Sequence, residues 1–375
     1  MSEKKEKYIF FYLKTGGGHL APAKAIADKI KKNYPTIEPL LIDGFAESPG
    51  FVRYIVEDGY RKLQANAKWV YEFLYLVSKT RLTAELNTFY LFFFTRKFIE
   101  RTILNEKPAK IIILHFFLIK PVYNVIRKHK LSIPVTTLVT DPFTAHPMWF
   151  LQRKQNLVLF SERLREKVRR NFPEEKLNVF PFVLNEKYSH PLLEEKILSL
   201  KKEFGIEGKK VILILGGGDG IPKGAMIIKE IVEANLDAHL IVVCGKNKRL
   251  EKQAEAINKK YNASLKIYGY IEFVYELINI SDIVISKCGA STMMEILLLQ
   301  KVPIINSYIW EQEKGNIDFI IDNHLGIYEP SVYKLGALLS RLIDDERFYN
   351  SYKQKIAESN FKNGLDEVTE YLIKL

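Results

Sequence analysis

The sequence of 375 residues has few cysteines and no long apolar run. Its two cysteines, Cys244 and Cys288, lack the spacing of a zinc site or of a disulfide framework, which favours a reducing compartment. No window reaches about 18 uninterrupted apolar residues, and the N-terminal stretch MSEKKEKYIF has no apolar core of signal-peptide length. We therefore expect neither secretion nor a membrane-spanning segment.

Two familiar phosphate-binding motifs are also missing. The stretch TGGGHLAPAKAI, residues 15–26, does not have the G-x-G-x-x-G spacing of a dinucleotide site, and it has no Lys followed by Ser or Thr. The sequence contains no convincing group of carboxylates for a cation, so we expect neither a metal nor another cofactor.

The charge is unevenly distributed. The net charge is +12, and all of this excess lies in residues 1–190. Such asymmetry indicates an anionic partner, either nucleic acid or an anionic membrane surface. The basic residues form no compact stripe and no nucleic-acid recognition motif is present, so we expect no nucleic acid.

Short apolar runs alternate with longer amphipathic segments, which is typical of parallel sheets wrapped by helices. A break near residues 182–200, where the stretch PFVLNEKYSHPLLEEK carries two prolines, separates two series of predicted strands. The first series comprises residues 8–13, 40–43, 110–114, 135–139, 157–160 and a short strand at Val179; the second comprises 211–215, 240–243, 265–268, 283–285 and 302–305. At this length, two Rossmann-like doubly wound α/β domains are expected.

Both series begin with a strand that runs into three glycines, FFYLKTGGGH in the first half and ILILGGGDG in the second. Ligands of open parallel sheets bind beyond the carboxyl ends of the strands, where glycine allows a close approach to the backbone. Two such sites are expected to face each other across a cleft. The alternative is that both loops are only tight turns.

Several blocks resemble the inverting GT-B glycosyltransferases that make monogalactosyl- and glucosyl-diacylglycerol, relatives of the enzyme that makes lipid II. These blocks are GGGH followed by PA, TDPFTAHPMWF at residues 140–150, GGGDG, the segment from YGYIEF to KVPII, and QEKGN. The resemblance covers most of the chain. It implies a GT-B fold with an acceptor and membrane-binding domain at 1–185, a nucleotide-sugar domain at 186–360, and a helix at 361–375 that crosses back.

The loop SKCGAST and the helix predicted after it suit a diphosphate, because a helix N-terminus offers free N–H groups and a positive dipole end. Gly289, Ser291 and Thr292 would hold the diphosphate, and Glu295 would accept hydrogen bonds from the ribose hydroxyls. Gly217 and Gly218 are also expected to bind the donor. The alternative is a capping box in which Thr292 caps the helix and Glu295 reaches back.

The resemblance assigns further donor-binding residues. It implies that Gln312 and Glu313 of the stretch EQEKGN bind the hexose, that Asn316 also binds the donor, and that uracil lies near Tyr270 and Ile271. A charged surface loop is the alternative for residues 311–316. This chain has Gly289-Ala290-Ser291 where the family usually shows Pro-Gly, which leaves the choice between glucose and galactose open.

In an inverting transfer the acceptor hydroxyl needs a base on the side opposite the leaving diphosphate. His19 is the expected base, with Gly17 and Gly18 clearing space for the acceptor, and Asp141 is the second candidate. The alternative for His19 is a histidine that caps the helix. The resemblance implies that His146, Pro147, Trp149 and Phe150 contact the lipid acceptor.

Residues 69–101 combine dense aromatic residues, among them Phe89 to Phe94, with five basic residues: Lys79, Arg81, Arg96, Lys97 and Arg101. Because this segment interrupts the alternation of strands and helices, we expect it to lie in the headgroup region of an anionic membrane. A buried pair of helices is the alternative.

Together these features predict a peripheral enzyme on the cytoplasmic face of the cell membrane. It would transfer a hexose from a UDP-sugar to diacylglycerol or a related lipid. Two alternatives stay open: a nucleotide-sugar isomerase of the UDP-N-acetylhexosamine 2-epimerase type, and a non-catalytic lipid- or nucleotide-binding protein.

Overall fold

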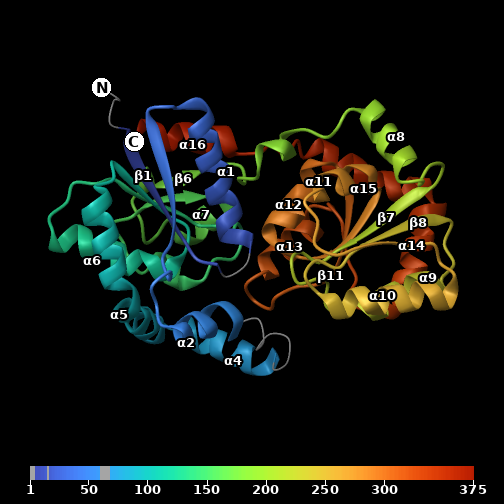
Figure 1. Ribbon diagram of the computed structural model, residues 1–375, viewed down its shortest axis with the longest axis horizontal. Helices are drawn as coiled ribbons and strands as arrows, with labels where there is room; N and C mark the ends of the chain where they lie inside the picture. The colour runs from blue at the N-terminus through green and yellow to red at the C-terminus, as the bar shows by residue number, and fades with distance from the viewer. Residues whose placement is uncertain (1–4, 15–16, 60–67) are drawn as a thin grey trace. The chain divides into compact units, whose positions relative to one another are not determined.

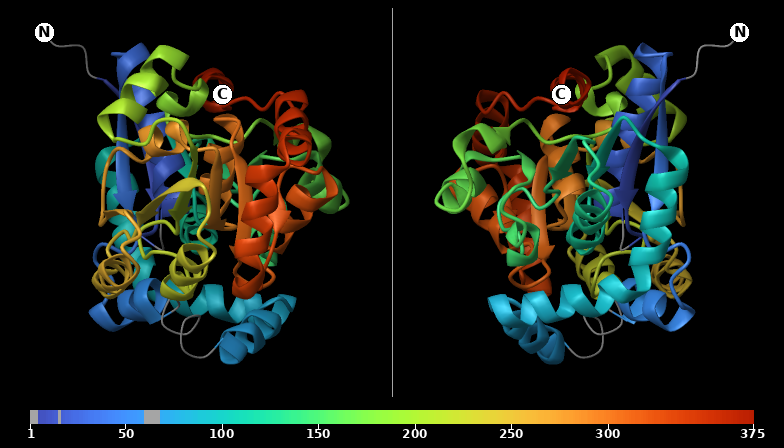
Figure 2. Two further views of the ribbon diagram at one scale, coloured as in Figure 1. Left: turned by 90° about the vertical axis from the view of Figure 1, so that its right-hand side faces the viewer. Right: turned by 90° about the vertical axis from the view of Figure 1, so that its left-hand side faces the viewer.

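A computed structural model describes residues 5–14, 17–59 and 68–375 and divides the chain into two compact units. Unit 1 contains the chain up to Glu186 together with Trp310–Gln312 and Asn363–Leu375, and unit 2 contains Lys187–Ile309 and Glu313–Lys362. Each unit has a six-stranded sheet with helices on both faces (Figures 1 and 2). The predicted α/β class with two doubly wound sheets is confirmed.

The strands of unit 1 are all parallel and follow the order β2-β1-β3-β4-β5-β6. They are β1 (Glu6–Tyr12), β2 (Ile37–Asp43), β3 (Lys110–Ile113), β4 (Val135–Leu138), β5 (Asn156–Leu159) and β6 (Leu177–Val179). All six predicted strands of the first half are present. The carboxyl ends of β1, β3 and β4 therefore lie next to one another at one edge of the sheet.

Seven α-helices accompany this sheet among the described residues. They are α1 (Gly17–Asn33), α2 (Gly50–Arg53), α4 (Lys68–Ser78), α5 (Arg81–Glu106), α6 (Ile119–Lys128), α7 (Glu162–Val168) and α16 (Leu365–Lys374). One face of β1, with Ile9 and Phe11, is buried against Ile99 of α5 and Val122 of α6. At the other face the Lys110 Nζ donates to the carbonyls of Leu372 and Ile373 in α16, at 2.8 and 2.7 Å.

Unit 2 repeats the arrangement with the order β12-β11-β10-β7-β8-β9, again with every pair parallel. Its strands are β7 (Lys210–Leu215), β8 (Ala238–Val243), β9 (Lys266–Tyr268), β10 (Ile283–Lys287), β11 (Val302–Ser307) and β12 (Ile327–Tyr328). Its helices are α8 (Glu194–Glu203), α9 (Gly224–Glu233), α10 (Lys248–Tyr261), α11 (Val274–Ile280), α12 (Ala290–Leu298), α13 (Lys314–Asp322), α14 (Leu335–Asp344) and α15 (Glu346–Glu358). Only β12 was not expected, because two residues are too short for a periodic pattern.

The aromatic and basic segment 69–101 lies in α4 and α5. Figures 1 and 2 show α2 and α4 beyond the carboxyl ends of the unit 1 strands. Helix α5 joins the core through Leu91, Ile99 and Ile103, and its first half also exposes apolar side chains. None of the helices in the described part of the chain is both long and apolar enough to cross a membrane.

Candidate functional site

The carboxyl edge of the unit 1 sheet gathers His19, His115 and Asp141. His19 lies in the first turn of α1 after β1, His115 follows β3, and Thr140 and Asp141 follow β4. The Thr140 Oγ1 lies 2.7 Å from the Nδ1 of His19, and the ring centroids of His19 and His115 are 4.6 Å apart. Sequence reasoning missed Thr140 and His115, although each comes within two residues of the end of a buried strand.

Burial shifts the pKa values of the two candidate bases in opposite directions. Burial lowers the pKa of His19 to about 4, although a backbone hydrogen bond to Leu114 acts in the opposite direction. Burial raises the pKa of Asp141 to about 6, against hydrogen bonds from Trp149 and Gln312. At neutral pH the imidazole of His19 is therefore uncharged and able to accept a proton, and its side chain is partly exposed.

Gly17 and Gly18 open space next to His19. A Cβ atom added to either glycine would have no neighbour within 4 Å, and neither has a positive φ. The backbone conformation therefore does not require glycine at these positions, and the absence of a side chain leaves the entrance to His19 clear. Thr15 and Gly16 of the same motif lie outside the described residues.

The structure corrects one expectation about the acceptor site. Trp149 is fully buried, so it offers no surface to a lipid, and its Nε1 donates to the Asp141 Oδ2 at 2.9 Å. His146 is also enclosed: its Nδ1 accepts from the Met148 amide at 3.2 Å and its Nε2 lies 3.1 Å from the Ser78 Oγ. Of these four residues, only Pro147 and Phe150 keep partly exposed side chains.

In unit 2 the glycines after β7 form a tight loop. Gly217 has a φ of +73°, which favours glycine, and a Cβ at Gly216 would lie 1.9 Å from the Ile221 amide nitrogen. Gly218 accepts a 2.7 Å hydrogen bond from the Lys246 amide. A Cβ at Gly217 would lie 3.8 Å from the Lys287 Cε. Lys287, at the end of β10, thus brings an ammonium group to this edge, and the sequence motifs did not single it out.

The capping-box alternative for Thr292 and Glu295 is wrong. Helix α12 begins at Ala290 with Gly289 as its N-cap, and no side chain bonds to the cap. Ser291 and Thr292 therefore lie inside the first turn with their backbone N–H groups at the carboxyl edge of the sheet. Burial raises the pKa of Glu295 to about 8, against the charge of Lys187. A mostly protonated carboxyl group at neutral pH both donates and accepts, which suits sugar hydroxyls.

The residues after β11 hold the α12 loop. The Asn316 Nδ2 donates to the Cys288 carbonyl at 2.8 Å from a side chain that is 3% exposed, so Asn316 positions the loop. The Glu313 Oε2 accepts from the Ile309 amide at 2.7 Å, and its other oxygen lies 3.7 Å from a Cβ placed at Gly289. Gln312 groups with unit 1, where it bonds to Asp141.

The residues expected to bind uracil lie in the loop after β9. Tyr270 is 64% exposed with the Lys246 Nζ 5.4 Å from its ring centroid, and Ile271 is partly exposed. Both side chains are thus accessible to a ligand, and their role stays a prediction.

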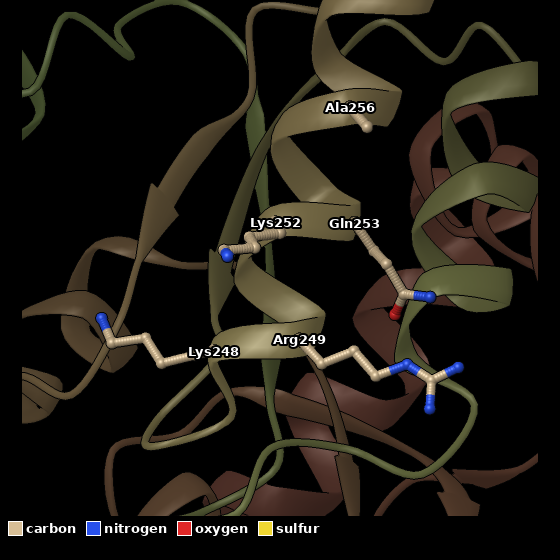
Figure 3. Close-up of a pocket in the computed structure, with 5 residues that line it drawn as sticks. All are labelled: Lys248, Arg249, Lys252, Gln253 and Ala256. Atoms are coloured by element: carbon tan, nitrogen blue, oxygen red, sulfur yellow. The ribbon is translucent and has the colours of Figure 1, made fainter.

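A hollow of about 450 Å³ on α10 does not belong to this site. It is lined by Lys248, Arg249, Lys252, Gln253 and Ala256, whose side chains point in different directions from one helix (Figure 3). No residue from a strand end lines it, and we assign it no role.

The hydrogen bond between Trp149 and Asp141 can be tested through the pKa of Asp141. Trp149→Phe removes an N–H that favours the charged carboxylate, so the pKa of Asp141 should rise further above its value of about 6. Carbon-13 NMR titration of the carboxyl groups measures this. The same substitution at Trp69, which is 75% exposed, is the control. An unchanged Asp141 titration in Trp149→Phe would contradict the assigned bond.

Comparison with known proteins separates the two halves of the chain in the same way. Residues 19–182 match the family described as Monogalactosyldiacylglycerol (MGDG) synthase. Residues 211–312 match the Glycosyltransferase family 28 C-terminal domain.

Two relatives and one solved structure illustrate the similarity. The probable chloroplastic monogalactosyldiacylglycerol synthase of Nicotiana tabacum is 24% identical over 352 residues, which cover 91% of this chain but only 65% of that protein, slightly less than two thirds. The processive diacylglycerol beta-glucosyltransferase of Bacillus pumilus is 25% identical over 376 residues, 98% of this chain and 95% of that protein. Anabaena HepE in complex with UDP-glucose shares the fold, with a TM-score of 0.58 at 10% identity over 98% of both chains.

The matches fall in the order that the motifs indicated, and the two parallel sheets are those of GT-B glycosyltransferases. The first half of the chain is thus similar to the MGDG synthases, the second half is similar to the C-terminal domain of glycosyltransferase family 28, and nearly the whole chain is similar to a diacylglycerol glucosyltransferase.

Proposed function

We propose that this protein is an inverting glycosyltransferase that transfers a hexose from a UDP-sugar to diacylglycerol or a related lipid at a membrane surface. The main support is the neutral imidazole of His19 at the carboxyl edge of the unit 1 sheet. At the carboxyl edge of the unit 2 sheet lie a glycine loop and the N-terminus of α12, to which no side chain bonds as a cap. Its relatives are named for the synthesis of glycolipids from diacylglycerol.

Unit 1 is the proposed acceptor domain, corresponding to the predicted limits 1–185 with the helix of 361–375. The acceptor hydroxyl attacks the anomeric carbon while His19 takes its proton, so that a new C–O bond forms as the bond to the diphosphate breaks. The neutral state of His19 leaves a lone pair for this step, and Thr140 holds the Nδ1.

Unit 2 is the proposed donor domain, corresponding to 186–360. The N–H groups at Ser291 and Thr292, together with the dipole of α12, balance the charge of the leaving UDP, so the step is proposed to need no metal ion. Glu295 binds the ribose hydroxyls, Glu313 binds the hexose, and Asn316 holds the loop through Cys288. Neither family match describes an isomerase, and the isomerase alternative gains no support.

The proposal can be tested with purified protein, vesicles that contain diacylglycerol, and each UDP-hexose in turn. We expect glycolipid with at least one donor. His19→Ala should lower kcat by roughly 10²- to 10⁴-fold, the usual contribution of a general base, while the dissociation constant for UDP stays unchanged.

The matched control is His129→Ala, because His129 binds Glu100 through its Nε2 and lies outside the site. Absence of glycolipid with every donor, accompanied by interconversion of UDP-N-acetylhexosamines, would contradict the proposal in favour of an isomerase.

The membrane contact is proposed to be the exposed apolar surface of α2, α4 and the first half of α5. Leu82, Leu86, Phe89 and Phe93 follow one another at helical spacing, and their exposed fractions are 70%, 58%, 48% and 48%. Trp69 and Phe51 add exposed rings from α4 and α2. A continuous apolar stripe exposed to this extent is typical of contact with a membrane or partner.

Basic side chains accompany this stripe. The Arg96 guanidinium lies 4.9 Å from the Phe93 ring centroid and the Lys120 Nζ lies 5.1 Å from that of Phe89. Cations placed beside exposed rings suit anionic headgroups. We propose that the enzyme is a peripheral protein on the cytoplasmic face. Anionic lipids are concentrated in the cytoplasmic leaflet, and both cysteines are unpaired, as expected in a reducing compartment.

A triple variant, Leu82→Ser, Leu86→Ser and Phe89→Ser, should weaken partition into anionic vesicles by at least about 100-fold, since each lost apolar contact weakens binding roughly 10-fold. Vesicle pelleting measures this, and the wild-type affinity should fall as salt rises. Leu193→Ser with Leu198→Ser, which removes exposed apolar residues of unit 2, is the control. Equal pelleting of the triple variant and the control would contradict the assigned surface.

A further inference from the structure

A second imidazole packs against the candidate base. His115 lies two residues beyond the end of β3 and is 3% exposed. Its ring stands at 61° to that of His19, in an edge-to-face arrangement at 4.6 Å. Since β3 pairs with β1, the sheet itself fixes the distance between the two residues.

The hydrogen bonding of His115 defines its tautomer. Its Nδ1 accepts from the Phe117 amide at 3.2 Å and thereby caps the short helix at Phe116–Leu118. An accepting Nδ1 carries no proton, so the neutral ring carries its proton on Nε2. Burial keeps the pKa of His115 well below its ordinary value, and a charge on His19 would lower it further.

Rings enclose His115 on several sides. Phe116 and Phe117 lie at 4.4 and 5.1 Å between centroids, and Trp149 lies at 6.4 Å. Phe116 in turn stacks on His146 at 5.8 Å. The ring of His115 therefore has little freedom to rotate, and one side of the His19 ring packs against this fixed ring.

The titratable groups around the pair come from two further segments. Asp141 follows β4 and has a pKa raised to about 6. His146 has a pKa lowered to about 4 by burial and by Lys79. At neutral pH His115 and His146 are thus uncharged, whereas the carboxyl group of Asp141 is mostly ionised and Lys79 adds a positive charge beside His146.

We propose that His115 is a positioning residue for His19. Its ring holds the imidazole of His19 in the orientation in which Nδ1 meets Thr140, and it keeps water away from one face of that imidazole. Separately, its Nδ1 accepts a hydrogen bond from the Phe117 amide and so caps the short helix Phe116–Leu118. The inference rests on the proposed role of His19 as the base.

Two variants distinguish the effect of the His115 ring from the effect of its hydrogen bond to the Phe117 amide. His115→Asn keeps an acceptor for the Phe117 amide but removes the ring, and His115→Phe keeps the ring but removes the acceptor. His129→Asn is the control for loss of a histidine from unit 1. The observables are the NMR titration of His19 in each variant and the kcat and KM for transfer from the UDP-hexose.

In His115→Asn, water replaces the missing ring, so the pKa of His19 should rise from about 4 toward 6.5. Misplacement of the base should lower kcat by about 10- to 100-fold with little change in the KM for the donor. His115→Phe should keep the titration of His19 near the wild-type value and restore most of kcat, although its thermal stability is expected to fall.

The proposal is overturned if His115→Asn leaves the His19 titration and kcat as they are in His129→Asn. It is also overturned if His115→Phe and His115→Asn lose activity equally, because the cap alone would then explain the residue. The NMR titration needs no substrate. A shifted His19 titration in an enzyme that makes no glycolipid would therefore contradict the proposed function and support the packing of His115 on His19.

Discussion

Removal of water from ionisable side chains at the carboxyl edge of a parallel sheet is the constraint on which the site depends. The order β1-β3-β4 places His19, His115 and Asp141 at neighbouring strand ends, where apolar residues and Trp149 surround them. Burial makes charge unfavourable there, so the histidines become weaker bases and the carboxyl group a weaker acid. An uncharged imidazole and a carboxyl group that titrates near neutrality result from packing.

The same principle acts in unit 2, with a different outcome. Glu295 is partly buried near the start of α12, and its raised pKa turns a carboxylate into a group that both donates and accepts. The loop before α12 is held by the buried Asn316, whose amide donates to the Cys288 carbonyl, and the loop after β7 is shaped by the positive φ of Gly217. In the proposed function, one sheet thus presents a proton acceptor, and the other presents fixed donors to the diphosphate.

The sequence pattern was sufficient to predict both sheets, because each buried strand is a short apolar run between longer amphipathic segments. Only the two-residue β12 was missed. The site was harder to predict. Trp149 was expected to contact lipid because sequence does not reveal which side of a loop is enclosed, and the structure buries it against Asp141. His115 belongs to no glycine-rich motif, and its importance comes from a contact with His19 that is 96 positions away along the chain. The hydrogen bond from Asn316 to the Cys288 carbonyl, just before α12, likewise joins residues 28 positions apart, which local spacing does not reveal.

The pH dependence of kcat/KM tests most directly whether His19 is the base, because this ratio reports the ionisation of the free enzyme. It should be measured with vesicles in which the acceptor is well below saturation, with circular dichroism at each pH to establish that the protein stays folded. A base must be unprotonated, so activity is lost as the pH falls through its pKa. The account predicts an acid limb near pH 4, the pKa of His19. A limb near pH 6 would contradict it, since that is the pKa of Asp141.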